Sequence, residues 1–248
     1  MRLGATQTRI RLVFTNFSYN NDNGAGFANE WPDAGDSGKR ADEYPSLSIA
    51  PESASAEELK LVQRLFFLSG IASPRVVVFC GVEPRDGSAS VCVRTGELLA
   101  ALVKQPVCLI DANLLSPSLH LRYGIDNVFG LADARPEHGK EKVRLIRGRN
   151  LWVLPAGIPN GKRPILSPNY VQDCITRLRE QFGYVLISAP SLGSYSDAVL
   201  LGQMTDGLVL VLKAHSTRRT MTLKARQSLE NYNVRLLGAV LNNCKSPS

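Results

Sequence analysis

Hydrophobic residues along the chain occur either in short continuous runs or at helical spacing. The run Val76–Phe79 is rich in β-branched residues and is typical of a strand buried on both faces. Further runs predict strands over Val107–Ile110, Tyr184–Ile187, Leu208–Leu212 and Leu236–Leu241. Helical spacing predicts helices over residues 88–104 and after Pro168, Ser196 and Ser216. Strands separated by helices indicate right-handed βαβ units, so we predict an α/β fold with a mostly parallel sheet flanked by helices on both faces.

The ordered domain is predicted to begin at Ser55. Ser55 and Glu58 have the spacing of a capping box, and leucines at helical spacing follow. Residues 16–54 are rich in turn-forming residues and poor in apolar ones, so we predict a largely disordered arm over residues 1–54 and a domain over 55–248. Within the arm, residues 8–14 alternate weakly and fit either a short strand or no regular structure. Residues 143–154 look extended, with a hairpin around Gly148.

Charge is distributed unevenly along the chain, whose net charge is +7. Residues 17–58 hold nine acidic and two basic residues, whereas residues 59–248 hold 24 basic and 13 acidic ones. The basic residues 59–248 fit two interpretations. They form a surface that attracts phosphates, nucleic acid or anionic lipid, or a solvated surface whose charge is balanced by the acidic residues 17–58. Aromatic interleaving and nucleic-acid-binding motifs are absent from the sequence, so we expect no nucleic-acid partner.

The five cysteines are scattered and include no CxxC pair, which indicates reduced, buried thiols. The apolar runs are too short to span a bilayer, and the first residues lack the pattern of a signal peptide. We therefore expect a cytoplasmic protein.

The turn after the first strand is the candidate functional site. In parallel α/β sheets, ligands bind beyond the carboxyl ends of the strands, where a turn opens a helix. We interpret Gly81 and Gly87 as the glycines of a GxxxxGK[ST] phosphate loop, whose amides and helix N-terminus hold phosphates. Taken alone, a strand, a glycine turn and a helix more often form a plain connection than an active site.

The side chains of this loop depart from the motif. Ser88 stands in place of the lysine and Ala89 in place of the metal-binding hydroxyl, with Ser90 as a conservative stand-in. Arg85 is the one cation within the turn, but it precedes the second glycine and so lies on the wrong side for the lysine's role. The vestigial nucleotide-binding loop would therefore comprise Gly81, Arg85, Gly87, Ser88, Ala89 and Ser90.

Seven segments, in order, resemble the bacterial tyrosine kinases of capsule and exopolysaccharide biosynthesis, which belong to the MinD/ParA-like P-loop proteins. Residues 109–120 resemble that family's second Walker-type motif, and residues 150–157 resemble its Asn-Leu-x-Val-Leu-Pro-Ala-Gly. The other matching segments are Gly124–Asp133, Tyr184–Pro190, Ser196–Ala198, Thr205–Gly207 and Gly238–Asn242. The resemblance covers about residues 55–242 and implies a P-loop fold that binds ATP or ADP with Mg²⁺.

The departures from this family matter as much as the matches. The family's Gly-Lys-Ser-Thr is replaced by Gly87 to Ser90, and its Asp-x-Asp is reduced to Asp111 and Asn113. Ser188 replaces the Walker B aspartate, so Asp111 is kept as a vestigial metal ligand and no residue is assigned as catalytic. We expect Asp111 to face the turn within about 15 Å, since a metal-bridged phosphate spans no more. Nucleotide binding is expected to be weak.

Three functions are compatible with these residues. The first is a kinase-like cytosolic regulator or adaptor of polysaccharide export, a pseudokinase. The second is an active tyrosine kinase or ATPase with an unusual loop, and the third is a ParA-like nucleic-acid-binding protein. The resemblance implies an inner-membrane chain-length regulator (co-polymerase) as partner and a position at the inner face of the membrane.

Two further surfaces leave alternatives open. Glu57, Lys60 and Gln63 align with a helix that drives ring assembly in the family, so they indicate a homo-oligomer contact or a solvated helix. The C-terminus lacks the family's tyrosine cluster. A basic strip fits two interpretations, a binding surface for anionic lipid or an acidic partner, and a solvated strand edge. Its residues are Lys140, Lys142, Arg144, Arg147 and Arg149.

Overall fold

The computed structural model describes residues 10–13, 54–68, 73–133, 143–146, 148–158, 166–194 and 196–243. Its strands are β1 (Ile10–Val13), β2 (Val76–Gly81), β3 (Val107–Asp111), β4 (Arg144–Leu145), β5 (Leu151–Leu154), β6 (Tyr184–Ser188), β7 (Gly207–Lys213) and β8 (Leu236–Asn242). Its helices are α1 (Ala56–Val62), α2 (Ser88–Leu102), α3 (Leu119–Tyr123), α4 (Pro168–Gln181), α5 (Asp197–Gln203) and α6 (Arg219–Asn231). A π-helical turn, η2 (Gln63–Phe67), continues α1, and a 3₁₀ turn, η4 (Leu131–Asp133), follows α3.

The strands form one eight-stranded sheet in the order β1-β8-β7-β2-β6-β3-β5-β4. The six inner strands are parallel, and the short edge strands β1 and β4 run antiparallel to their neighbours. The predicted α/β fold with a mostly parallel sheet is therefore confirmed.

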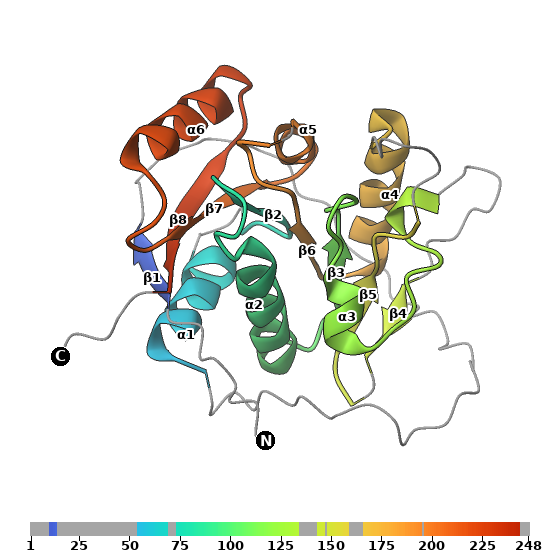
Figure 1. Cartoon of the computed structure of the whole chain (residues 1–248). Coiled ribbons are helices and arrows are strands. Elements are labelled where there is room, and N and C mark those ends of the chain that lie inside the picture. Colours follow the sequence, from blue (N-terminus) through green and yellow to red (C-terminus); the bar gives the residue numbers. More distant parts are fainter. Residues whose placement is uncertain are drawn as a thin grey trace, which may run out of the picture.

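Helices cover both faces of the sheet (Figure 1). Strand β2 shows why, since Val76, Val78 and Cys80 belong to one apolar cluster and Val77 and Phe79 to the other. The first cluster includes residues of α4, α5 and α6, and the second includes residues of α1, η2 and α2. Because both faces are buried, the strands read as continuous apolar runs, and this made them recognisable in the sequence.

The predicted capping box at the start of α1 is present. The Ser55 side chain accepts a hydrogen bond from the amide of Glu58, and the Glu58 carboxylate accepts one from the amide of Ser55. Glu58 also forms an ion pair with Arg94 of α2, and its residue is only 5% exposed. One carboxylate therefore both caps α1 and ties it to α2.

Acidification is expected to loosen this contact. Burial raises the pKa of Glu58, but the bonds from Arg94 and Ser55 outweigh burial and leave it below its ordinary value. A depressed pKa contributes stability that is present above the unfolded-state pKa and is lost as the pH falls through the folded-state value. Unfolding by urea should show the native chain losing more stability below about pH 4.5 than Glu58→Gln does. Equal pH dependence of the two proteins would contradict this role.

Three elements refine the sequence-based expectations. Ile10–Val13 is a strand that pairs with β8, which decides between the two alternatives left open for residues 8–14. The hairpin around Gly148 is present, with β4 and β5 antiparallel and Gly148 at φ 70°. The short helix α3 lies where only a loop was expected. The prediction of a disordered arm over residues 16–54 lies outside the described residues, apart from Ala54.

Four of the cysteines are free and buried, as predicted, and Cys244 lies outside the described residues. Burial raises the pKa of the Cys92 thiol well above its ordinary value, so it stays protonated and unreactive. None of the helices in the described ranges is long and apolar enough to cross a bilayer.

Candidate functional site

The candidate site lies at the carboxyl edge of the sheet, where β2, β6 and β3 end side by side. Asp111 pairs with Ser188, and Ser188 pairs with Phe79, two residues before the end of β2. Since neighbouring strands lie about 4.8 Å apart, the backbones at Asp111 and Phe79 are separated by roughly 10 Å. The fold thus brings Asp111, Ser188 and the loop to one edge, as the sequence predicted.

The loop between β2 and α2 contains two residues in the left-handed region, Arg85 at φ 71° and Gly87 at φ 86°. A side chain at Gly87 would meet the Asn242 amide nitrogen, since a Cβ atom there would lie 2.2 Å from it. Gly87 is therefore required both by its backbone conformation and by the close approach of β8. Arg85 is exposed, and as a non-glycine residue in this region it costs about 1 kcal/mol of strain.

Asp86 closes the loop on itself. Its carboxylate accepts hydrogen bonds from the amides of Val82 at 3.0 Å and Glu83 at 2.8 Å. Its other oxygen accepts one from the hydroxyl of Thr217 at 2.8 Å, and Asn242 donates to its backbone carbonyl at 2.9 Å. Asp86 is 3% exposed, so this network is buried. The Glu83 amide, which would otherwise be available to an anion, is thus occupied by a side chain of the loop, and the Val82 amide also donates to the carbonyl of Val211.

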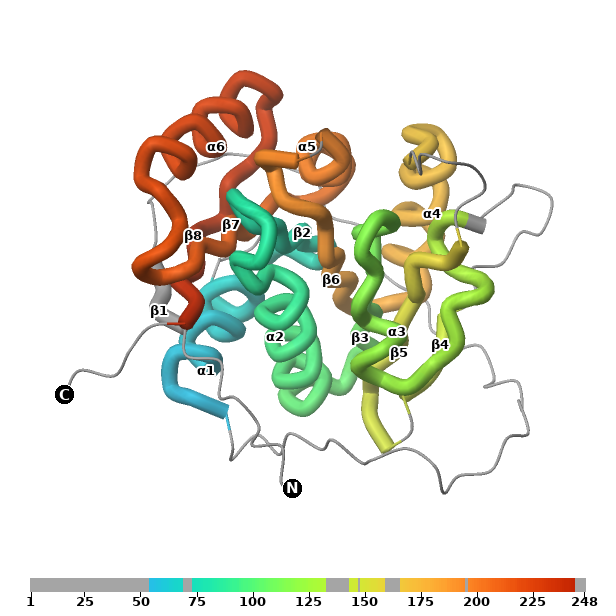
Figure 2. Tube along the Cα trace, in the orientation of Figure 1, coloured from blue at the N-terminus to red at the C-terminus, as the bar shows by residue number. Residues whose placement is uncertain are grey.

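The same network joins segments that are far apart in the sequence. Thr217 also accepts a hydrogen bond from the amide of Lys213 at the end of β7. In Figure 2 the teal loop after β2 accordingly lies beside the red segment that leads into α6. The loop is therefore fixed to the ends of β7 and β8.

The N-terminus of α2 retains the backbone of a phosphate site. Gly87 caps this helix without a side-chain hydrogen bond, and the first helical bond runs from Val91 to Gly87. The amides of Ser88, Ala89 and Ser90 donate to no acceptor among the described residues. Such amides and the positive end of the helix dipole attract an anion, but weakly in the absence of a cationic side chain.

The Asp111 carboxylate is engaged by its own loop. One oxygen accepts hydrogen bonds from the amides of Ser118 at 2.7 Å and Leu119 at 2.9 Å, and the other accepts one from Asn113 at 3.2 Å. Asp111 thereby caps the start of α3. Its side chain is buried, and burial raises its pKa, with the three amides partly offsetting that effect.

The donors at this edge do not fit a magnesium ion. Asp111 already accepts three backbone hydrogen bonds, and the side-chain oxygen of Asn113 accepts one from Ser116. Ser188 offers a hydroxyl where a carboxylate would be needed. The ranges that the structure describes contain no group of three histidine, cysteine or carboxylate residues placed to hold a metal. Mg²⁺ demands near-octahedral oxygen ligands, so the role of Asp111 as a vestigial ligand stays a prediction.

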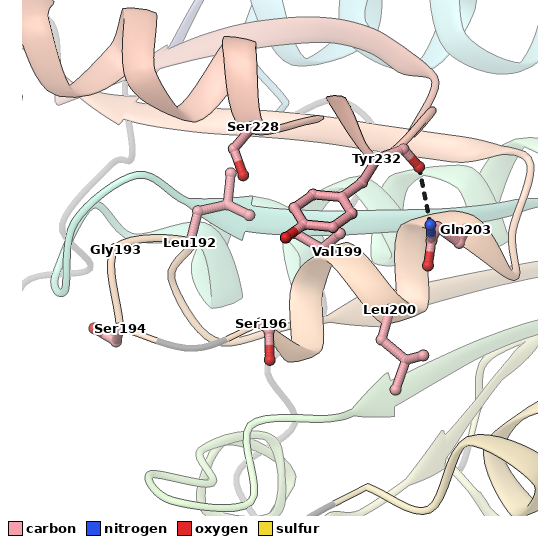
Figure 3. A pocket seen from close by; sticks show the side chains of 9 residues that line it. All are labelled: Leu192, Gly193, Ser194, Ser196, Val199, Leu200, Gln203, Ser228 and Tyr232. Carbon is pink, nitrogen blue, oxygen red and sulfur yellow. Dashed lines mark hydrogen bonds between the residues drawn. The ribbon is translucent and has the colours of Figure 1, made fainter. Parts of the chain in front are cut away.

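An open hollow of about 590 Å³ lies between α5 and α6, beside the loop (Figure 3). Backbone bonds from Leu192 to Gly81 and from Gly193 to Val82 hold its rim against the loop. All of its lining residues are uncharged; they are Leu192, Gly193, Ser194, Ser196, Val199, Leu200, Gln203, Ser228 and Tyr232. The hollow therefore supplies no replacement for the missing lysine.

Two features of the loop differ from what the sequence indicated or were not visible in it. Five residues separate Gly81 from Gly87, one more than GxxxxG allows, so Val82 and not Gly81 occupies the position of the first glycine. The role of Asp86 was also missed, because its partner Thr217 lies 131 residues away and no local pattern joins them. The acidic residue beside a glycine in a turn was the only available signal.

Comparison with solved structures defines the class of the fold. The chimerical protein CapA2B2 superimposes with a TM-score of 0.71 at 19% identity, covering 80% of this chain and 87% of that one. The kinase domain of the Escherichia coli tyrosine kinase ETK gives 0.64 at 18% identity over 77% and 78%. The Pyrococcus furiosus cell division ATPase MinD gives 0.57 at 21% identity, covering 67% and 70%. The fold is that of the MinD/ParA-like P-loop proteins.

Sequence comparison is more specific. The tyrosine-protein kinase YwqD of Bacillus subtilis (strain 168) is 26% identical over 199 residues, which cover 79% of this chain and 84% of that protein. The tyrosine-protein kinase CpsD of Streptococcus pneumoniae serotype 4 is 34% identical over 95 residues, which span only 41% of its length. No family model matches the chain. The chain is thus a relative of the bacterial tyrosine kinases, the family that its motifs resembled.

Proposed function

We propose that this chain is a pseudokinase: a kinase-like regulator or adaptor of exopolysaccharide or capsule biosynthesis that acts through protein contacts. Its relatives include tyrosine-protein kinases and the Rhizobium meliloti succinoglycan biosynthesis transport protein ExoP, 25% identical over 201 residues. ExoP is much longer, since the aligned part is 25% of its length. The proposed partner is an inner-membrane chain-length regulator, met at the cytoplasmic face of the membrane.

The observation that carries this proposal is the chemistry of the loop. Phosphoryl transfer depends on charges that are fixed before the reaction, and removing one such group commonly costs ~10²–10³ in rate. Here the first turn of α2 presents Ser88 and Ala89, and Ser188 lies in the Walker B position. Two of the acidic side chains at this edge, Asp86 and Asp111, are engaged by backbone amides. ATP or ADP is therefore expected to bind weakly, through the α2 amides.

The test is a measurement of turnover in the unmodified protein. We expect no Mg²⁺-dependent ATP hydrolysis and no tyrosine phosphorylation above the level of a no-enzyme blank. The informative variant is Asp111→Asn, because asparagine keeps one acceptor for the α3 amides, whereas Asp111→Ala removes the cap altogether. Turnover that depends on Mg²⁺ and is lost in a folded Asp111→Asn protein would establish an active kinase or ATPase and reject the pseudokinase.

A further inference from the structure

A cluster of cationic side chains lies at the carboxyl edge of the sheet, beside the β7–α6 turn. Residues 207–229 contain five basic residues and no acidic one. One of the five, Arg226, is paired with Glu230. The remaining four lie at the end of β7, in the turn or in α6, and the turn lies beside the loop that carries Arg85, because Thr217 of the turn is bonded to Asp86. We call this set the α6 cationic cluster: Arg85, Lys213, Arg218, Arg219 and Lys224.

The charges of this cluster are available to a partner. Arg85, Arg218, Arg219 and Lys224 are exposed, and Lys213 is half-buried. Across the described ranges, no hydrogen bond or ion pair involves any of their charged groups. Of the basic strip singled out in the sequence, Arg144 is paired with Asp126 and Arg149 with Glu97, whereas Lys140, Lys142 and Arg147 lie outside the described residues. The cations of the α6 cluster therefore differ from the two described residues of that strip.

An exposed leucine lies within the cluster. Leu223 is 53% exposed and follows Arg219 by one helical turn, whereas Ala225 and Leu229 of the same helix are buried against the sheet. Cations around an exposed apolar side chain on a helix are the combination found in surfaces that bind the membrane interface. The hollow of Figure 3 contains none of the five cations, so the cluster lies outside that hollow.

We propose that the α6 cationic cluster binds an anionic membrane surface, with the arginines and lysines at the lipid phosphates and Leu223 in the interface. Single-stranded nucleic acid would need aromatic side chains on which bases stack, and the cluster has none. Binding of this kind is peripheral and orients the carboxyl edge of the sheet, with the candidate site, toward the lipid. It is independent of whether the site turns ATP over.

The experiment measures co-sedimentation of the full chain with vesicles of phosphatidylglycerol and phosphatidylcholine. Each cation near an anionic surface contributes about fivefold to binding, so Arg219→Gln with Lys224→Gln should weaken it roughly 10- to 30-fold. The control double variant, Lys104→Gln with Arg235→Gln, removes the same charge from exposed positions at the amino edge of the sheet. That control should stay within about twofold of the native chain, because its charges do not face the lipid.

A substitution of Leu223 distinguishes binding to a membrane from binding to another polyanion. Leu223→Ala should weaken vesicle binding roughly fivefold, since it removes apolar surface from the interface. The matched control is Leu121→Ala, at a leucine of α3 that is 74% exposed and should leave binding unchanged. Equal losses in the two charge variants, no effect of Leu223→Ala, or binding to duplex DNA without binding to vesicles would each overturn the proposal.

Discussion

Restoring the four degenerate positions is expected to restore nucleotide binding. The quadruple variant carries Ser88→Lys, Ala89→Ser, Asn113→Asp and Ser188→Asp, and the backbone amides at the N-terminus of α2 are already free to meet a phosphate. A charge-assisted bond from the new lysine contributes about 1.5–3 kcal/mol, which corresponds to roughly 10- to 100-fold tighter binding of Mg²⁺-ATP. Titration calorimetry of the native and quadruple proteins measures the difference.

The carboxylate introduced by Ser188→Asp is also expected to change the stability of the protein. Asp111 and Ser188 are direct neighbours across β3 and β6, and both are 1% exposed. Ser188→Asp places two buried carboxylates side by side, which disfavours their joint ionisation. The quadruple variant should therefore be less stable than the native chain without metal and should regain stability with Mg²⁺.

A control with Ser88→Met in place of Ser88→Lys adds a side chain of similar length without its charge. It should bind Mg²⁺-ATP no better than the native protein. If the lysine and methionine versions bind equally well, or neither binds, the loop is not a phosphate site that has lost only its side chains.

Removing the Glu97 carboxylate is expected to cause the largest loss of stability. Glu97 of α2 has a side chain that is 2% exposed; it accepts hydrogen bonds from Tyr123 at 3.1 Å and Arg122 at 3.3 Å and forms an ion pair with Arg149 at 3.2 Å. Breaking a buried ion pair commonly costs 3–5 kcal/mol, because the partner charges remain unpaired. Glu97→Ala should lose about that much in urea unfolding.

The same contacts predict where the loosening occurs. Arg122 and Tyr123 belong to α3, and Arg149 lies in the β4–β5 hairpin, so hydrogen exchange should rise there first. Glu230→Ala is the control, since Glu230 pairs with Arg226 at 2.8 Å but is 53% exposed. An exposed pair contributes at most about 1 kcal/mol. Similar losses in the two variants would show that Glu97 is not the anchor of α3.

The order and type of the main elements followed from the sequence. Strands buried on both faces need continuous apolar runs, and helices need apolar residues every three or four positions, so both patterns are local and visible. The capping box at Ser55 was visible for the same reason, because its two partners lie three residues apart. The replacements at four positions could be identified by comparing the sequence with the family's motifs alone; the positions are Ser88, Ala89, Asn113 and Ser188.

The contacts of Asp86 with distant residues were decided by tertiary structure. Asp86 meets Thr217 and Asn242 only because β2, β7 and β8 are adjacent in the sheet. The availability of the α6 cations, and the pairing of Arg144 and Arg149, likewise depend on which acidic residues lie nearby in space. Local patterns fix which elements form. The partners of a charged side chain depend on contacts across the fold, and therefore only the folded chain shows which charges remain free for function.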